Sequence, residues 1–573
     1  MSTTDRSSQA NPGTQPYRIL PAIIIVTLQW TLWLFVPLLF HGGTINTLSV
    51  FGGMLGGLAI LVWWLFFSRV PLLFRWVGFL IMVLAVLALT QLADPSITTA
   101  YQGMMIYAYA IPTLCMGVVA WVILARKITG ITRWVTMIAF IIVFSGFWAL
   151  LRSEGLTGGG EAQFAWRWSE SVEERFIAGE SDRKTFAAPV ELDISPGVSW
   201  PGFRGPDRNA VVYGLEIETD WDQNPPEELW RSPVGPGCSS FAVKGDLIFT
   251  QEQRDMNEAV TCYRLNNGEP VWVYEYEARF WDSHAGAGPR STPELDSSRV
   301  YTLGATGILS VLDISDGNLI WSRDAASDAK AELPGWGFAG SPLLVDDLVL
   351  VAVGGTLVAY DRKNGMVRWT GPEGGKGYSS PQLFTIEGAT QVVLLGGNGI
   401  TGFEPATGNV IWEYADPEER IVQPGMTGDG RILLSTRNGA ALLCLAVKRQ
   451  PDAWSVTEEW TSNRLKPNFN DYVIHKGYAY GFDGMSLSCV DLQDGSRMWK
   501  SGNYGGQILL LADQDMLLVL SEKGELSLIR AQPDGFEELA SISAIEGRTW
   551  NHPALTGKIL LVRNSREMAA YKL

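Results

Sequence analysis

The stretch Gly307-Ile-Leu-Ser-Val-Leu-Asp313-Ile-Ser-Asp-Gly317-Asn-Leu-Ile-Trp321 contains the unit that determines the fold of this protein. Apolar and polar residues alternate up to Asp313, which is typical of a β-strand. Gly317 permits the positive φ of a tight turn. Trp321 then opens the next strand with a large ring that can pack on a neighbouring sheet. The stretch therefore predicts a β-hairpin that carries a packing tryptophan on its second strand.

The same spacing recurs along the second half of the chain: a polar residue, three residues, Gly, three residues and Trp. Five copies fit without a gap, one later copy ends in Leu539 instead of Trp, and another is stretched by an insertion. The tryptophans of the series are Trp230, Trp272, Trp321, Trp369, Trp412, Trp460 and Trp499. They stand 39 to 49 residues apart, which is the length of one four-stranded propeller blade.

The two ends of the repeat region predict how the ring closes. Residues 568–573 form a strand that lacks the following tryptophan strand, and residues 228–231 form a tryptophan strand that lacks three predecessors. Together they complete one blade and remove the exposed sheet edges. Residues 200–573 are therefore expected to form an all-β, eight-bladed β-propeller.

The first part of the chain is apolar and predicts a transmembrane domain. Five runs, at about residues 20–40, 48–67, 76–92, 103–125 and 134–151, contain no formally charged side chain. A bilayer core needs roughly 20 helical residues. We therefore expect an all-α domain of five transmembrane helices over residues 1–152, followed by a linker over residues 153–199 with a short amphipathic helix near residues 168–176.

Lys and Arg alternate between the loops and predict the orientation. They occur before the first run, between the second and third, and between the fourth and fifth, at Arg6, Arg18, Arg69, Arg75, Arg126, Lys127 and Arg133. The other two loops carry none. Because Lys and Arg are retained inside, the amino terminus is expected in the cytoplasm and the propeller in the periplasm of a bacterium, as part of a multi-pass inner-membrane protein.

Charge excludes one class of partner. The chain has 44 Lys and Arg and 60 Asp and Glu, of which 8 and 2 precede residue 153. The remaining 36 and 58 give residues 153–573 a net charge of −22. An acidic surface of this kind repels polyanions and argues against a nucleic-acid ligand.

Candidate site residues follow from aligning the repeats, because the segments that lead into the innermost strands meet at one mouth of the central channel. These segments contain aromatic and polar side chains of the kind that line ligand pockets. The ligand-binding candidates are Arg279, Arg290, Trp336, Tyr378, Arg420, Gln423, Lys466, Trp550 and His552. Asp282 or His284 could act as a base, and Asn468, Asn470 and Asp471 could offer oxygen ligands to Ca²⁺. The alternative is that these groups bond to one another and to water to satisfy strand ends.

The Asp-x-x-x-Gly-x-x-x-Trp repeats resemble those of pyrroloquinoline-quinone (PQQ) dehydrogenases and of BamB-type assembly propellers. The resemblance implies a quinoprotein alcohol dehydrogenase-like fold and, for the dehydrogenases, PQQ with Ca²⁺ as cofactor. The helices ahead of the propeller look like those of membrane-bound quinoprotein dehydrogenases that pass electrons to ubiquinone. This chain departs from the dehydrogenases because it lacks long insertions and an adjacent cysteine pair, and from BamB-type proteins because it has no lipidation cysteine.

Two functions remain open from the sequence. The first is a membrane-anchored periplasmic binding or scaffold module for an envelope component, a peptide or a small ligand. The second is a PQQ-dependent sugar or alcohol dehydrogenase that delivers electrons to membrane quinone. The residues favour the first, because a fold alone does not determine function. The first function also does not need the insertions and the cysteine pair that this chain lacks.

Overall fold

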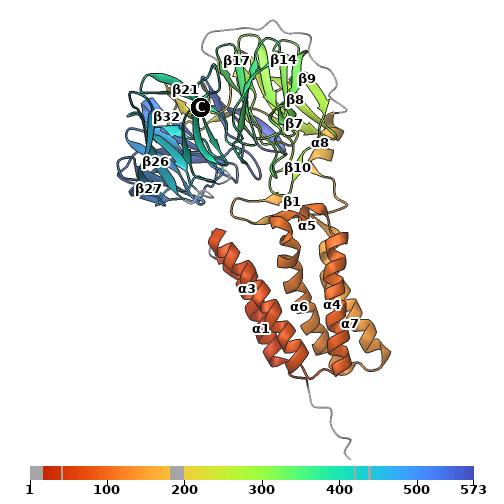
Figure 1. Cartoon of the computed structure of the whole chain (residues 1–573). Helices are drawn as coiled ribbons and strands as arrows, with labels where there is room; N and C mark the ends of the chain where they lie inside the picture. Colours follow the sequence, from red (N-terminus) through yellow and green to blue (C-terminus); the bar gives the residue numbers. More distant parts are fainter. Residues whose placement is uncertain (1–16, 40–42, 181–198, 418–420, 437–440) are drawn as a thin grey trace, which may run out of the picture. The chain divides into compact units, whose positions relative to one another are not determined.

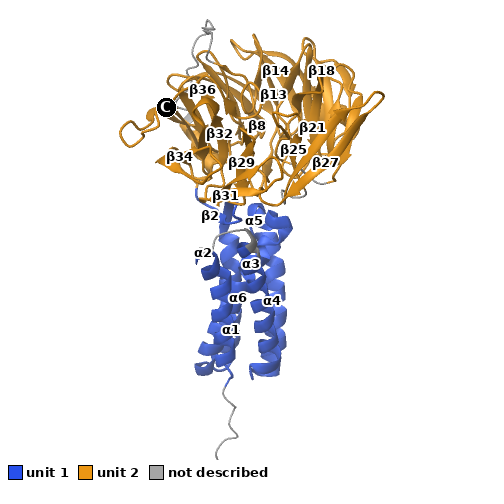
Figure 2. Ribbon diagram, turned by 90° about the vertical axis from the view of Figure 1, so that its left-hand side faces the viewer, with its two compact units in different colours: residues 1–169 blue, residues 170–573 orange. Residues whose placement is uncertain are grey.

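The computed structural model describes residues 17–39, 43–180, 199–417, 421–436 and 441–573. It divides into two compact units, residues 1–169 and residues 170–573, which Figure 2 shows in different colours. The first unit is mainly helical and the second mainly β.

The first unit contains apolar helices at each expected run. Its principal helical segments are α1 (Leu20–Trp30), η1 (Thr31–Phe35), α2 (Val36–Leu39), α3 (Gly43–Val62), η2 (Trp63–Phe67), α4 (Leu72–Leu92), α5 (Pro95–Thr98), η3 (Ala100–Gly103), α6 (Met105–Leu124), η4 (Ala125–Lys127), α7 (Ile131–Gly146) and η5 (Phe147–Leu150). Over the described residues, four helices have the length and composition to cross a membrane, whereas the helix over Leu20–Phe35 is shorter. Figure 1 shows α1, α3, α4, α6 and α7 side by side.

Small residues allow these helices to approach closely, as in many membrane bundles. A Cβ at Gly57 of α3 would lie 2.4 Å from Ile111 of α6, and one at Gly117 of α6 would lie 2.7 Å from Phe144 of α7. The unit ends in a feature that the helical pattern did not predict. Strands β1 (Leu151–Leu156) and β2 (Ala162–Trp166) form an antiparallel hairpin directly after η5.

The second unit confirms the eight-bladed propeller over its described residues. Blade 1 is β3 (Ser199–Trp200), β6 (Ala242–Lys244), β7 (Leu247–Arg254), β8 (Asn257–Arg264) and β9 (Pro270–Glu277); blade 2 is β12 (Glu294–Leu295), β13 (Arg299–Leu303), β14 (Ile308–Asp313) and β15 (Leu319–Asp324); blade 3 is β16 (Leu343–Val345), β17 (Leu348–Val353), β18 (Thr356–Asp361) and β19 (Val367–Thr370); blade 4 is β20 (Gln382–Ile386), β21 (Ala389–Gly396), β22 (Gly399–Phe403) and β23 (Val410–Ala415).

Blade 5 is β24 (Gly425–Met426), β25 (Ile432–Ser435), β26 (Leu442–Arg449) and β27 (Trp454–Ser462); blade 6 is β28 (Val473–His475), β29 (Tyr478–Asp483), β30 (Ser486–Asp491) and β31 (Arg497–Ser501); blade 7 is β4 (Val211–Val212), β32 (Gln507–Leu511), β33 (Met516–Leu520), β34 (Glu525–Arg530) and β35 (Glu538–Ser543); blade 8 is β36 (Ala554–Thr556), β37 (Ile559–Arg563), β38 (Glu567–Lys572) and β5 (Glu227–Pro233). A two-stranded hairpin, β10 (Trp281–Asp282) and β11 (Gly286–Ala287), lies between blades 1 and 2 in the chain.

The motif residues join each blade to the next. Trp321 of blade 2 donates a hydrogen bond from Nε1 to the carbonyl of Arg362 in blade 3, at 3.1 Å. Its ring covers Gly365, where a Cβ would stand 2.6 Å from the indole and φ is +70°. Glycine is therefore needed at this position for both its backbone conformation and its size. Equivalent bonds join Trp230 to Leu265, Trp272 to Ile314, Trp369 to Pro405, Trp460 to Leu492 and Trp499 to Gln532.

Trp412 is an exception with a local cause. Its Nε1 donates to Oε1 of Gln391 in its own blade, at 2.6 Å. The next blade lacks the Asp-x-x-x-Gly turn, because β26 and β27 extend into a longer hairpin there. The carbonyl that the other tryptophans use is thus missing from the expected place in the sequence.

The ring closes as the two chain ends of the repeat region predicted. Strand β5 pairs antiparallel with β38, and Trp230 lies opposite Ala570. Arg231 of β5 also forms an ion pair with Glu567 of β38, at 2.8 Å. The first and last strands of the propeller therefore share blade 8.

One helix of the expected linker belongs to the second unit. Helix α8 (Val172–Glu180) is preceded by Ser171, whose hydroxyl accepts from the amide of Glu174 while the Glu174 carboxylate accepts from the amide of Ser171. This reciprocal pair is a capping box. Glu173 of α8 accepts two hydrogen bonds from the Arg279 guanidinium, at 2.8 and 2.9 Å. Helix α8 thus packs against the end of blade 1.

Candidate functional site

The central channel of the propeller is occupied by residues 199–212, which we call the plug. The plug begins as β3, paired with the innermost strand β6 of blade 1, and ends as β4, paired in parallel with the innermost strand β32 of blade 7. It therefore crosses the channel from one blade to another. The repeat pattern did not predict this segment as part of the channel.

Two buried arginines attach the plug to other blades. Arg204 donates to the carbonyl of Tyr472 in blade 6, at 2.6 Å, and lies 3.7 Å from a carboxylate oxygen of Asp471. Arg208 donates to Glu294 of blade 2, at 2.7 Å, and to the carbonyl of Pro342 beside blade 3, at 2.8 Å. Burial raises the pKa of Glu294 to about 7, although Arg208 acts in the opposite direction. Buried charged groups therefore hold the plug in place.

The plug backbone is strained at three non-glycine residues. Arg204, Arg208 and Ala210 have φ of +62°, +53° and +61°. Residues without glycine's freedom adopt this region at a cost, which the surrounding contacts must offset. The bonds of the two arginines supply such contacts.

The mouth predicted from the repeats brings several of its aromatic residues together. The rings of His284 and Trp336 lie 5.9 Å apart, and those of Trp336 and Tyr378 lie 5.0 Å apart. Trp281 is 39% exposed and lies in the same β10–β11 hairpin as His284. Burial lowers the pKa of His284, against the effect of Asp282. We call His284, Trp336, Tyr378 and Trp281 the aromatic mouth.

The polar candidates near the aromatic mouth bond mainly to the protein itself. Asp282 accepts from the amides of His284 and Ala285, at 2.7 and 2.9 Å, and pairs with Arg290. Trp550 donates to Glu522, at 2.6 Å. The Asp282 carboxylate therefore holds the hairpin in shape, which is a structural role.

A second set of candidates lies deeper, around Asp471. Its carboxylate accepts from the amide of Gln423, at 2.9 Å, and contacts Nε2 of His552, at 3.2 Å. Burial lowers the pKa of His552. Burial acts to raise the pKa of Asp471, but Arg204 and His552 hold it below its ordinary value. The plug residue Phe203 packs edge-on against His552, with ring centres 5.1 Å apart.

The residues around Asp471 do not fit a Ca²⁺ site. Arg204 lies beside the Asp471 carboxylate as its cation, and the Asn470 amide nitrogen donates to the carbonyls of Gly505 and Gly506, at 3.0 and 2.7 Å. Within the described ranges, no three His, Cys, Asp or Glu side chains gather in a way that could hold a metal ion. The one carboxylate among the expected Ca²⁺ ligands, Asp471, is therefore already paired with a cation.

Three other candidates lie apart from this set, and a fourth lies outside the described residues. Arg279 pairs with Glu173 of α8, and Lys466 pairs with Asp483, at 3.1 Å. Asn468 is exposed. Arg420 is the candidate outside the described residues.

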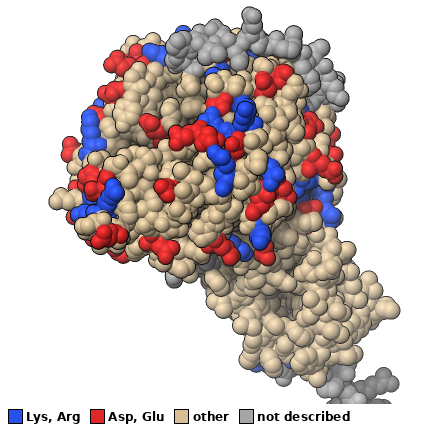
Figure 3. Space-filling model, turned by 45° about the horizontal axis from the view of Figure 1, so that its top comes forward, with Lys and Arg blue, Asp and Glu red and all other residues tan. Residues whose placement is uncertain are grey.

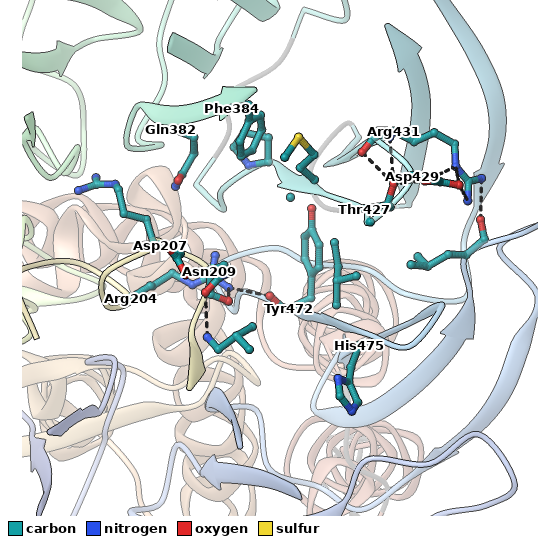
Figure 4. Close-up of a pocket in the computed structure, with 18 of the residues that line it drawn as sticks. Arg204, Asp207, Asn209, Gln382, Phe384, Thr427, Asp429, Arg431, Tyr472 and His475 are labelled. Atoms are coloured by element: carbon teal, nitrogen blue, oxygen red, sulfur yellow. Dashed lines mark hydrogen bonds and ion pairs between the residues drawn. The ribbon is translucent and has the colours of Figure 1, made fainter. Parts of the chain in front are cut away.

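A cavity of about 610 Å³ remains beside the plug, along the inner strands of blades 4, 5 and 6. Figure 4 shows Gln382 and Phe384 on one wall and Tyr472 and His475 on another, with Arg204, Asp207 and Asn209 of the plug at one end and Thr427, Asp429 and Arg431 at the other. Sequence reasoning missed this set. The available signal was the pair of arginines in the Gly- and Pro-rich segment that begins the propeller.

The geometry and the sequence comparisons agree on the class of protein. A family model described as "Outer membrane protein assembly factor BamB" matches residues 273–501. The quinohemoprotein alcohol dehydrogenase ADHIIG from Pseudomonas putida HK5 has the same fold, with a TM-score of 0.50 and 13% identity over 71% of this chain and 82% of that one. The chain is therefore a β-propeller of PQQ-like repeats preceded by apolar helices.

Within this class the chain is similar to assembly factors by sequence. It is 24% identical to the outer membrane protein assembly factor BamB of Shewanella oneidensis over 335 residues, which cover 53% of this chain and 78% of that protein. It is 20% identical to BamB of Yersinia pestis over 324 residues, which cover 54% and 71%.

Proposed function

We propose that this protein is a membrane-anchored binding module, whose helices hold the propeller at a bacterial inner membrane and whose aromatic mouth binds an envelope protein or peptide. The aromatic row His284, Trp336 and Tyr378 carries the proposal. Aromatic side chains that combine an apolar body with a polar tip are enriched at binding interfaces. The similarity to outer membrane protein assembly factors supports an envelope protein as the partner.

The acidic propeller fits this role. Figure 3 shows Lys, Arg, Asp and Glu intermixed over the propeller surface in view. No single basic field of the kind that binds nucleic acid dominates that surface. The partner is therefore expected to be recognised by aromatic and polar contacts at the mouth.

The binding proposal is tested by co-purification from the native membrane. The double variant Trp281→Ala and Trp336→Ala should lose a reproducible partner that the unchanged protein retains. Met366→Ala, which removes an apolar side chain 65% exposed on the outer rim of a blade, is the control and should retain it. A partner kept by the double variant would overturn the proposed mouth.

Orientation is tested separately with reporter fusions. A phosphatase that folds only outside the cytoplasm should be active when fused after Gly159 and inactive when fused after Gly130. The reverse pattern would place the propeller in the cytoplasm and contradict the periplasmic role.

The dehydrogenase alternative has its own test. Addition of PQQ and Ca²⁺ to the purified protein should give neither cofactor absorbance nor dye-linked oxidation of sugars or alcohols. Turnover with either substrate class would replace the binding proposal by an oxidoreductase.

A further inference from the structure

The geometry points to a second binding site, in the cavity beside the plug, for a short extended peptide that carries apolar and basic side chains. This inference goes beyond the proposed function because it needs neither the aromatic mouth nor an envelope partner. It rests on three observations: the open inner edges of blades 4 to 6, the buried side chain of Gln382 and the acidic charge around Asp207.

The plug itself shows how the channel receives extended chain. Its residues add as strand β3 to β6 in antiparallel pairing and as strand β4 to β32 in parallel pairing. The amide of Leu510 in β32 donates to the carbonyl of Ala210 in the plug, at 2.9 Å. Strand addition to an exposed sheet edge is an established way to bind peptides, with main-chain bonds giving affinity.

The inner edges of blades 4 to 6 have no such partner among the described residues. Strands β20, β24 and β28 end their sheets on the channel side, and residues of all three line the cavity. The inner strands β32 and β36 of blades 7 and 8 are buried throughout. By contrast, Phe384 of β20, which lines the cavity, is only half-buried. The plug therefore lies to one side and leaves the edge of β20 accessible.

Gln382 provides the independent observation. It is only 2% exposed, and its Nε2 has no hydrogen-bond partner among the described residues. In Figure 4 its side chain extends from β20 toward the plug segment that carries Asp207. A buried amide donor without a partner costs free energy, so a ligand carbonyl at this place would be stabilising. Glu294 at the corresponding position of blade 2 is already used by Arg208 of the plug.

The walls indicate which peptide side chains fit. Phe384, Met426 and Ile474 give the cavity apolar surface. The exposed carboxylate of Asp207 has no ion-pair partner in the described part of the chain. The four cations of the lining are each paired with a carboxylate: Arg204 with Asp471, Arg208 with Glu294, Arg431 with Asp429 and Lys476 with Asp515. With a net charge of −22 beyond residue 152, the propeller also attracts cations at longer range. The preferred peptide therefore has an apolar residue next to Lys or Arg.

The test uses the full chain in detergent micelles and a random octapeptide library as the probe. Affinity selection should enrich peptides with apolar and basic residues, and hydrogen exchange should show protection of the Gln382–Ile386 strand when the best peptide is bound. Because one hydrogen bond is lost, Gln382→Leu should weaken that peptide about fivefold to tenfold. Asp207→Asn should remove the preference for Lys and Arg.

Two further variants make the outcome decisive. Met426→Trp places a large ring in the cavity beside β20 and should weaken binding at least about tenfold. Thr556→Val changes another buried polar side chain whose Oγ1 has no partner in the described chain, but on β36 and outside the cavity lining, and it should keep binding. Absence of enrichment, or equal binding by the unchanged protein and Met426→Trp, would overturn the site. Binding lost in Trp336→Ala but kept in Met426→Trp would place the peptide at the aromatic mouth, which overturns this inference and leaves the proposed function standing.

Discussion

Gly365 shows how single residues specify the blade contacts. The turn needs its φ of +70°, and the Trp321 ring of the preceding blade leaves no space for a side chain. The same two requirements apply at Gly268, Gly317, Gly408 and Gly495. They explain why the repeats keep glycine at this position. The motif was therefore readable from sequence, because each of its residues has a local and repeated cause.

Gly365→Ala should lower the free energy of unfolding by at least about 1–2 kcal/mol, the cost of a left-handed conformation for a residue with a Cβ. Contact with Trp321 adds to this cost. Gly484→Ala is the control, because Gly484 has a similar φ of +68° but nothing lies within 4 Å of its added Cβ. Denaturant unfolding followed by tryptophan fluorescence measures both, and equal destabilisation would contradict the role given to the ring.

Glu294 makes stability depend on pH. Its pKa is about 7 in the folded protein and lies near 4.5 in the unfolded chain. Between these values the folded state holds a proton that the unfolded state releases, so this contribution to stability falls as the pH rises from 4.5 to 7. The variant Glu294→Gln has no titratable group at this position, so it lacks this pH-dependent contribution to stability.

Thermal midpoints measured from pH 4.5 to 8 test this prediction. The midpoint of Glu294→Gln relative to that of the unchanged protein should rise with pH up to about pH 7 and then stay constant. His552, whose pKa is lowered by burial, acts in the opposite direction in both proteins and cancels in the comparison. Parallel pH profiles would show that Glu294 does not titrate in this range.

At the scale of elements, the plug depends on a buried charge pair. Arg208→Met leaves Glu294 without its cation and should cost about 3–5 kcal/mol. The double variant Arg208→Met with Glu294→Leu should recover most of that loss, because an apolar pair can replace a buried ion pair.

An exposed pair provides the control for the plug. Arg368 and Asp347 form an ion pair with side chains 47% and 67% exposed, and Arg368→Met should cost less than about 1 kcal/mol. Chemical denaturation measures all three variants. A double variant as unstable as Arg208→Met alone would mean that the plug needs these charges for its shape.

The plug could not be predicted from the sequence. Blades follow from local repeats, but β4 pairs with β32 about 300 residues later in the chain, and no periodic pattern announces that pairing. Arg204 and Arg208 look like loop residues by composition, since arginine is rarely buried. Among the candidates for the mouth, the rings of His284, Trp336 and Tyr378 lie next to one another. Arg279 and Lys466 instead pair with acids that lie outside the aligned segments.

At the scale of the whole molecule, the shared eighth blade determines the integrity of the propeller. Ala569 of β38 lies directly opposite Arg231 of β5, a geometry suited to a disulfide. In the variant Ala569→Cys with Arg231→Cys, oxidation should raise stability by up to about 4 kcal/mol, because the cross-link closes a very long loop.

The oxidised and reduced forms of that same variant are the matched comparison. The thermal midpoint should rise on oxidation and return on reduction. Formation of the disulfide without any change in the midpoint would show that the ring opens elsewhere before blade 8 separates.

Sharing a sheet between β5 and β38 also has a consequence for biosynthesis. A ribosome must reach β38 before β5 meets its partner, so the growing product carries an unsatisfied β-edge until then. A product that stops before β38 cannot close the ring. Synthesis of β38 thus removes an open strand edge that would otherwise invite pairing with other chains.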